Sequence, residues 1–292
     1  MVIVRISHGL GNQMFQYAIG HALAAANRSP LKLDLTHYRS HQDRAYGLDH
    51  FRISATPAAD AEITAISGCP PGERKRGLAR HLDQLRRAIS PGDQRHVVRE
   101  TGRRFDPRVL ERRGELYVMG YWQARGYVEA AAASLRPEFA LVSPPSADNA
   151  RWLDVVRQRP AIALHVRRGD YVNHPRFQMA DPLAYYRAAF QHVAERQEGV
   201  QCLIFSDDLR WAEANLRLPA TMHFIGHNQA APHEDLRLMS SCAHQIIANS
   251  TFSWWAAWLN PNPDKIVCAP HTWFNHDSAA AADLLPPGWQ CF

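Results

Sequence analysis

The sequence predicts an α/β protein with mostly parallel strands, and three observations support this fold class. Residues 2–35 read as a strand, a helix and a second strand, which together make a βαβ unit. From residue 161 to residue 268, short apolar runs alternate with helical patterns, as in a doubly wound parallel sheet. Between these regions, Ser143-Pro-Pro-Ser146 is typical of a linker. We therefore expect two domains, residues 1–145 and 146–292.

The βαβ unit opens the chain. We expect a strand over residues 2–6, then a tight loop over residues 8–13 that contains two glycines. The following helix of about four turns carries inward-facing apolar side chains, namely Met14, Phe15, Tyr17, Ala18 and Leu23. Asn27-Arg-Ser-Pro30 ends it, and residues 31–35 form the next strand. The loop is not a dinucleotide fingerprint, because Met14 stands where GxGxxG requires its third glycine.

A basic segment spans residues 73–113. It holds 13 Lys and Arg against 6 Asp and Glu, a local excess of 7 that exceeds the net charge of +5 for the whole chain. A narrow apolar stripe recurs at helical spacing in Leu78, Leu82, Leu85 and Ile89. The pattern fits a solvated helix that covers the core, or a basic amphipathic helix on an anionic membrane surface. A nucleic-acid-binding role is not expected, because it would leave the polar loops of the second half unexplained.

Four strands of the second half run directly into polar loops. We expect these four strands at residues 161–166, 200–205, 222–225 and 244–248, and a fifth strand at residues 265–268, with helices between them. One helix begins at Asp181-Pro182, an N-cap followed by proline, and continues to about Gln197. In a parallel sheet the carboxyl ends of the strands share one edge, where ligands bind. The arrangement therefore favours an enzyme or a nucleotide-binding protein over a structural protein.

Two of these loops suit a bound diphosphate. Arg167 and Arg168 follow the first strand, and guanidinium groups bind phosphate oxygens in bidentate fashion. The next residue, Gly169, would let a ligand approach the backbone. A helix rich in aromatic residues is expected to end near Leu259, and we expect a second anion site at its start, where hydroxyl groups and free backbone N–H groups lie together. The residues of this site are Asn249, Ser250, Thr251, Phe252 and Ser253. The alternatives are a local salt bridge between Arg168 and Asp170 and a simple N-cap.

Carboxylates and tryptophans near these loops have two interpretations. Asp207 and Asp208 could accept hydrogen bonds from a ribose or a base, or could form another N-cap. No Asp-x-Asp spacing occurs in the chain, so no metal is expected and protein cations would neutralise the diphosphate. The aromatic helix is apolar on all sides, so we expect core packing for Trp254, Trp255 and Trp258.

The cysteines and the apolar runs indicate a compartment. Cys69, Cys202, Cys242, Cys268 and Cys291 form no Cys-x-x-Cys pair and no metal-ligand spacing, which is typical of a reducing environment. We expect Cys202 and Cys268, which lie in strand-like runs, to be buried thiols. The first apolar run is too short for a signal peptide, and no stretch approaches the ~20 apolar residues of a membrane span. We therefore expect a cytoplasmic protein.

Seven segments in order along the chain carry a family resemblance. They are Gly9-Leu-Gly-Asn-Gln-Met-Phe-Gln-Tyr17, Arg44-Ala-Tyr-Gly-Leu-Asp-His-Phe51, Gly120-Tyr-Trp-Gln123, His165-Val-Arg-Arg-Gly-Asp-Tyr171, Phe205-Ser-Asp-Asp208, Glu234-Asp-Leu-Arg-Leu-Met239 and Ile246-Ile-Ala-Asn-Ser-Thr-Phe-Ser-Trp-Trp-Ala-Ala-Trp-Leu-Asn260. With these motifs, the chain resembles the bacterial α-1,2-fucosyltransferases of glycosyltransferase family 11.

The resemblance implies a fold and an activity. The fold would be GT-B-like, with two Rossmann-like domains facing a cleft, the first for the acceptor and the second for GDP-fucose. The activity would be inverting transfer of fucose to the 2-hydroxyl of a terminal β-galactoside, without a metal or another cofactor. Arg167 resembles the arginine that contacts the donor diphosphate, with His165 beside it, and Asn12 resembles the asparagine of the N-terminal glycine loop.

The sequence departs from the family pattern at two places, and the resemblance does not identify a general base. His8 stands where the family often has another glycine, and residues 172–180 fit the pattern poorly. Candidate bases in the first half are Asp34, Asp49 and His8, and a reaction with an early sugar cation would need no strong base. Rival functions are a transferase for another GDP-sugar or acceptor and a non-catalytic GDP-sugar binder. The expected acceptor is a surface glycan or its precursor, and residues 73–113 are a candidate segment for peripheral contact with the inner membrane.

Overall fold

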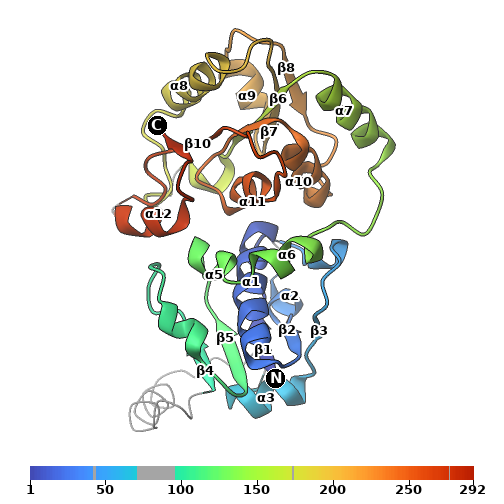
Figure 1. The fold of residues 1–292 in the computed structure, drawn as a ribbon, viewed down its shortest axis with the longest axis vertical. Coiled ribbons are helices and arrows are strands. Elements are labelled where there is room, and N and C mark those ends of the chain that lie inside the picture. Colours follow the sequence, from blue (N-terminus) through green and yellow to red (C-terminus); the bar gives the residue numbers. More distant parts are fainter. Residues whose placement is uncertain (42–43, 71–95, 173, 276) are drawn as a thin grey trace. The chain divides into compact units, whose positions relative to one another are not determined.

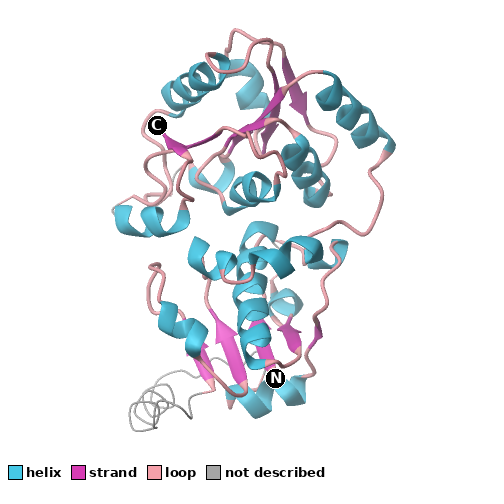
Figure 2. Ribbon diagram, viewed as in Figure 1, coloured by secondary structure: helices cyan, strands magenta, loops and turns pink. Residues whose placement is uncertain are grey.

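Contacts divide the chain into two units, Met1–Ala140 and Leu141–Phe292, and the division lies just before the Ser143–Ser146 segment. The structure is a computed structural model that describes residues 1–41, 44–70, 96–172, 174–275 and 277–292. Each unit contains one parallel sheet with helices packed on it, shown in magenta and cyan in Figure 2.

The first unit is built on a five-stranded sheet of order β3-β2-β1-β5-β4 (Figure 1). The strands are β1 (Val2–Arg5), β2 (Leu31–Asp34), β3 (Thr56–Pro57), β4 (Val97–Arg99) and β5 (Leu116–Met119). The helices are α1 (Leu10–Asn27), α2 (His37–Ser40), α3 (Asp60–Ser67), α5 (Arg125–Glu129) and α6 (Ala132–Glu138), with 3-10 turns η1 (Leu48–His50) and η3 (Pro107–Glu111). All pairings between the strands are parallel.

Alternation along β1 explains why helices cover both faces of this sheet. Ile3 packs with Ile63 and Ile66 of α3. Val4 points to the other face, where a Cβ on Gly20 of α1 would lie only 2.8 Å from its side chain. Glycine at position 20 therefore lets α1 approach β1 closely.

The predicted βαβ unit is confirmed, with one change at its loop. Helix α1 begins at Leu10, so residues 10–13 belong to its first turn and not to the loop. The five apolar side chains predicted to face inward are all buried. The helix ends at Asn27, and Arg28 adopts a left-handed C-cap conformation with φ 48°.

The second unit is built on a six-stranded parallel sheet of order β11-β10-β9-β6-β7-β8 (Figure 1). The strands are β6 (Ala161–Val166), β7 (Gln201–Ser206), β8 (Met222–Ile225), β9 (His244–Ile246), β10 (Val267–Ala269) and β11 (Gln290–Cys291). The helices are α7 (Ala147–Gln158), α8 (Pro182–Ala194), α9 (Leu209–Asn215), α10 (Pro232–Ser241), α11 (Thr251–Leu259) and α12 (Ser278–Leu284), with a 3-10 turn η4 (Gly169–Tyr171).

The central strand β6 sends alternate side chains to opposite helical layers. Leu164 and Val166 pack with Tyr186 and Phe190 of α8 in one apolar cluster. His165 points to the other face, where its ring lies 5.8 Å from that of Phe252 in α11. This alternation decides that the histidine of the His165–Tyr171 motif faces α11.

Most predictions for the second half are confirmed. The five predicted strands lie within two residues of β6 to β10. Asp181 accepts a hydrogen bond from the backbone N–H of Ala184 and so caps α8, although the helix ends at Ala194 and not near Gln197. The tryptophans of α11 are core residues, and Cys202 and Cys268 are buried free thiols.

The basic segment is only partly covered by the structure. The predicted stripe Leu78, Leu82, Leu85 and Ile89 lies outside the described residues. Within the described ranges, no helix is both long enough and apolar enough to cross a membrane.

Candidate active site

Register brings the first two predicted loops of the second unit together. Val166 of β6 pairs with Ser206 of β7, so Arg167 and Asp207 leave neighbouring strands at the same level. Arg167 Nη1 lies 3.0 Å from Asp207 Oδ2, and the Arg168 backbone N–H donates to Asp207 Oδ1 at 2.9 Å. The predicted gathering of polar residues at this edge is therefore confirmed for these two loops.

Arg167 is held in a partly buried position. Its side chain is 18% exposed, and its Nη2 lies 2.5 Å from Asp170 Oδ1. Its guanidinium carbon lies 5.2 Å from the centre of the Tyr171 ring. Its Nε is buried and, within the described part of the chain, has no hydrogen-bond acceptor. A buried donor without an acceptor is uncommon in folded proteins, and a ligand is one way to satisfy it.

Arg168 has different partners. Its Nε lies 3.4 Å from Asp208 Oδ2, and its guanidinium carbon lies 3.9 Å from the centre of the Trp211 ring, a cation–π contact. Asp208 also accepts from the Trp211 backbone N–H, so the alternative reading of Asp208 as an N-cap is confirmed. The alternative salt bridge between Arg168 and Asp170 is wrong, because Asp170 pairs with Arg167.

Gly169 is required by the close approach of Asp207. A Cβ at this position would lie 2.5 Å from Asp207 Oδ2. From the sequence we expected this glycine to let a ligand approach the backbone. In the structure, the Asp207 carboxylate, which pairs with Arg167, occupies the space beside Gly169.

His165 is a neutral positioning residue for α11. Burial, and secondarily the charge of Arg167, lower the pKa of His165 from 6.5 to about 3. Its Nδ1 lies 2.9 Å from Ser253 Oγ, and Ser253 is fully buried. The enclosed hydroxyl cannot face a bound anion, so we correct the assignment of Ser253 from anion binding to the support of His165.

Asn249 is also a positioning residue. Its side chain is buried, and its Nδ2 donates to the backbone carbonyls of Phe177 at 2.8 Å and Trp273 at 3.3 Å. It thereby joins the loop before α8 to the loop after β10. This use of its amide group differs from the direct ligand contact that we predicted.

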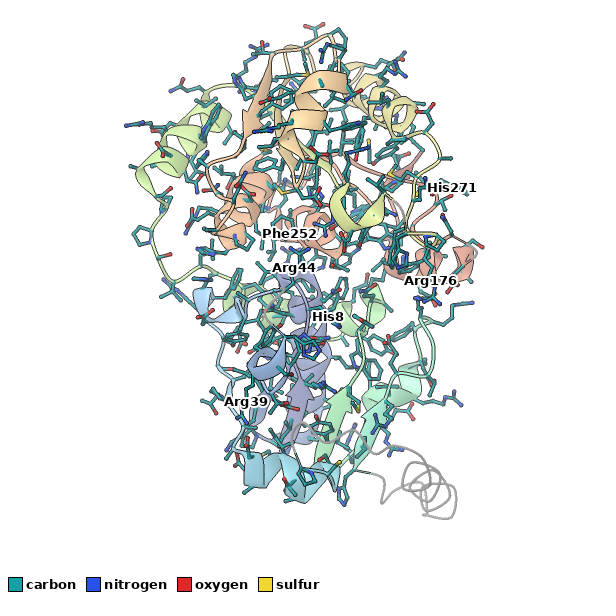
Figure 3. The ribbon with its side chains drawn as sticks, turned by 180° about the vertical axis from the view of Figure 1, so that it is seen from behind. His8, Arg39, Arg44, Arg176, Phe252 and His271 are labelled. Carbon is teal, nitrogen blue, oxygen red and sulfur yellow. The ribbon has the colours of Figure 1, made fainter. Side chains whose placement is uncertain are left out.

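The start of α11 keeps the other predicted anion-binding residues. Ser250 is the N-cap and makes no side-chain capping bond. Thr251 and Phe252 are partly exposed. Phe252 is labelled in Figure 3. The first turn contains no acidic residue that would repel an anion. Ser250, Thr251 and Phe252 therefore stay candidates for contact with a ligand.

The loop after β8 is tied to the interior of the unit. Asn228 and His227 both contact Asn149 Oδ1 of α7, at 3.0 and 2.7 Å. Asn228 also donates to Asp235 Oδ1 at 2.9 Å. Burial, with a smaller effect of the neighbouring Glu234 charge, raises the pKa of Asp235 to about 6. A perturbed carboxyl at the strand-end edge is typical of functional sites.

Four residues at this edge were not predicted as site residues, namely Asp170, Tyr171, Trp211 and Asp235. Asp170, Tyr171 and Asp235 lie within the quoted motifs His165–Tyr171 and Glu234–Met239 and could have been found from them, although the raised pKa of Asp235 depends on its burial. Trp211 could not, because its contact with Arg168 depends on the packing of α9.

The predicted residues of the first unit are placed as follows. Asn12 is in the first turn of α1, and its Oδ1 accepts from Gln123 Nε2 at 2.8 Å. The candidate base Asp34 is buried and accepts from Tyr117 Oη at 2.5 Å, which rules out direct contact with an acceptor in this conformation. Asp49 is exposed in η1, and His8 follows β1. Within the described residues, no group of three or more His, Cys, Asp or Glu side chains could hold a metal ion.

Comparison with known proteins adds family and fold. The model of Glycosyl transferase family 11 matches residues 110–292. An Escherichia coli α-1,2-colitosyltransferase is 29% identical over 298 residues, covering 99% of this chain and 98% of the relative. The human galactoside α-(1,2)-fucosyltransferase 1 is 33% identical over 108 residues, which cover 35% of this chain and 30% of the human protein.

A solved structure supports the fold. A mutant of Arabidopsis thaliana FUT1 in complex with GDP has a TM-score of 0.50 and 14% identity, covering 89% of this chain and 68% of that one. At this identity the likeness shows the fold alone. The fold is GT-B-like, as the sequence resemblance implied.

Proposed function

The chain belongs to glycosyl transferase family 11, and from that membership we propose that it transfers L-fucose from GDP-β-L-fucose to a terminal β-galactoside. The bond formed joins fucose to the 2-hydroxyl of the galactose in α linkage, with inversion at the fucose carbon. The observation that carries the proposal is Arg167, a constrained guanidinium at the carboxyl end of β6 with a buried Nε that lacks an acceptor.

A donor diphosphate would complete the contacts of Arg167. One phosphate oxygen could accept from Nε, and another could replace Asp170 at Nη2. The Asp170 side chain is 61% exposed, so its ion pair with Arg167 is screened by water and exchange costs little. Asp207, at 25% exposure and also bonded to the Arg168 backbone, would stay and keep the guanidinium oriented.

The chemistry then needs stabilisation of the departing GDP. Negative charge grows on the diphosphate as the bond to fucose breaks, and a prepositioned cation binds that state more strongly than the ground state. Arg167 supplies the cation, and the backbone N–H groups at the start of α11 can add dipoles. The neutral His165 donates no charge; it holds Ser253 and the first turn of α11 in place. We propose that these groups act without a divalent metal or another cofactor.

The nucleoside part has a separate candidate. Asp207 and Asp208 are already bonded to arginines and to backbone N–H groups. Asp235 lies at the same edge with a pKa of about 6, so it is ionised at neutral pH and able to accept from ribose hydroxyls or base N–H groups. We therefore favour Asp235 over Asp207 and Asp208 for this contact.

A second candidate function is transfer of a different deoxy sugar. The colitosyltransferase matches nearly the whole chain, whereas the human fucosyltransferase matches about a third. Colitose lacks the 3-hydroxyl of fucose, so the same diphosphate contacts would serve both donors. A non-catalytic GDP-sugar binder is the remaining rival. For each transferase we propose a surface glycan or its precursor as the acceptor, with peripheral membrane contact through residues 73–113.

The test combines binding and product analysis in EDTA. Thermal unfolding would be followed with GDP, GDP-fucose, UDP-galactose and NAD, where a ligand at a hundred times its Kd stabilises by about 2.7 kcal/mol. Incubation with methyl β-galactoside and either GDP-fucose or GDP-colitose, followed by NMR of the product, identifies donor and linkage. Arg167→Ala should abolish transfer, whereas the matched control Arg157→Ala, at an exposed ion pair, should not.

Stabilisation by GDP and GDP-fucose alone, with an α-1,2 fucoside as product, is the expected result. A colitoside formed much faster would favour the second candidate. Binding without any product would favour a non-catalytic binder, and absence of a shift with both guanine nucleotides would refute the assignment of the diphosphate site.

A further inference from the structure

Tyr121 is an exposed aromatic residue in the loop after β5. Within the described ranges, the exposed large apolar side chains are Tyr121 at 45%, Val142 at 59% and Phe292 at 37%. Tyr121 stands at the carboxyl end of β5, the edge at which parallel sheets place their ligands. An exposed ring at such an edge is suited to contact with a ligand that has both apolar and polar parts.

The backbone of this loop is held by side chains from elsewhere in the first unit. The Glu100 carboxylate, just after β4, accepts from the backbone N–H of Tyr121 at 2.7 Å and of Trp122 at 2.8 Å. Gln16 of α1 donates to the Gly120 carbonyl at 3.1 Å. The indole of Trp122 is buried. The exposed ring is therefore presented from a rigid loop and not from a flexible one.

Two residues here adopt a conformation that bulky side chains rarely take. Trp122 has φ 58° and His8, after β1, has φ 64°; the third such non-glycine residue in the described chain is Arg28, which ends a helix. Each costs roughly 1 kcal/mol or more and persists where the surroundings or a function require it. The family resemblance had placed a glycine at position 8, and the left-handed backbone explains why glycine fits there.

Tyr121 connects the two residues with left-handed backbone, because it precedes Trp122 in the chain and its ring contacts His8. Strands β1 and β5 are neighbours, so the loops that follow them are adjacent. The His8 and Tyr121 rings are stacked at 5.3 Å with an interplanar angle of 26°, and His8 Nε2 lies 3.0 Å from Tyr121 Oη. His8, which is labelled in Figure 3, also contacts the His37 ring, with the ring centres 5.0 Å apart. The exposed tyrosine is thus the outer member of a cluster of aromatic rings.

We propose that Tyr121, supported by His8, is the subsite that binds the sugar ring of the acceptor. Galactopyranose presents one face of C–H bonds, formed by H3, H4 and H5, which can pack on an exposed aromatic ring. The polar edge made by Tyr121 Oη and the imidazole lies beside that ring, where a sugar hydroxyl can hydrogen-bond. The assignment rests on the proposed function only in taking a galactoside as the acceptor.

The experiment measures acceptor binding without the donor. Saturation-transfer NMR with methyl β-galactoside and the full chain should show the strongest transfer to H3, H4 and H5. Tyr121→Ala should remove it and raise the Kd for the galactoside about tenfold or more, the effect of losing one buried apolar contact. Tyr121→Phe should keep binding within about threefold, because the ring remains. His8→Gly, which suits the left-handed backbone, should weaken binding without unfolding the loop.

The controls separate this assignment from the function itself. Val142→Ala removes another exposed apolar side chain and should leave galactoside binding unchanged. GDP affinity should be the same in wild type and Tyr121→Ala. Unchanged galactoside binding in Tyr121→Ala, or equal losses in Tyr121→Phe and Tyr121→Ala, would overturn the stacking subsite. A wild-type protein that binds galactoside at Tyr121 but not GDP would instead refute the proposed donor.

Discussion

Gly169→Ala tests whether the fit between η4 and Asp207 maintains the geometry of Arg167. The added Cβ would stand 2.5 Å from Asp207 Oδ2, whereas ordinary contacts begin near 3.4 Å, so one of the two atoms must move by about 0.9 Å. The same Oδ2 lies 3.0 Å from Arg167 Nη1. A movement of that size along the contact lengthens the ion pair beyond hydrogen-bond range.

The expected effects follow from that displacement. A hydrogen bond to a charged group contributes about 1.5–3 kcal/mol, and the 25% exposure of Asp207 places this one at the lower end, so unfolding free energy should fall by about 1–2 kcal/mol. A shift of about 1 Å at a reacting site can reduce the rate about a hundredfold. We therefore expect kcat/KM for transfer to fall between tenfold and a hundredfold. Denaturant unfolding measures the change in stability, and initial-rate assays measure the change in kcat/KM.

Gly102→Ala is the matched control. Gly102 has no atom within 4 Å of its added Cβ and no left-handed backbone, so this change should leave both stability and transfer near wild type. A Gly169→Ala protein that behaves like Gly102→Ala in both assays would refute a role of the Gly169–Asp207 contact in positioning Arg167.

Three further predictions concern single side chains. Arg167→Lys should keep the fold but lose most transfer, since an ammonium cannot contact two phosphate oxygens side by side; initial rates with GDP-fucose decide this. Asp235→Asn should stabilise the protein at pH 7 by up to about 3 kcal/mol, because the pKa of Asp235 is raised from 3.8 to about 6 and ionisation therefore costs stability as pH rises through 6. That difference should vanish in urea titrations at pH 4, and GDP affinity should fall if Asp235 contacts the nucleoside. For His165, whose pKa is lowered from 6.5 to about 3, stability should decline as pH falls below 6.5, and His165→Asn should reduce that decline in thermal unfolding between pH 7 and pH 4.

Much of the fold could be predicted because its signals are local. The apolar run before Arg167 became β6 with the expected ends, and Asp181-Pro182 began α8, since strand burial and N-capping depend on neighbours in the chain. The end of α8 was predicted three residues too late, because no glycine or proline stands next to Ala194 to mark the end of the helix. At α1 the opposite holds, because Gly9 and Gly11 predict a loop where the helix already begins at Leu10.

The sequence by itself determined the two parallel sheets, the strand-end loops and the arginines at one of them, because apolar periodicity and breaker residues specify these features directly. Only the tertiary structure decided what each loop side chain does. Ser253 supports His165 across 88 positions, Asp207 binds Arg168 across 39, and Tyr121 stacks on His8 across 113. From the sequence alone, adjacent polar residues in a loop are equally good candidates for contact with a ligand. Their roles separate when distant segments pack against them, enclosing the Ser253 hydroxyl while leaving the Tyr121 ring exposed.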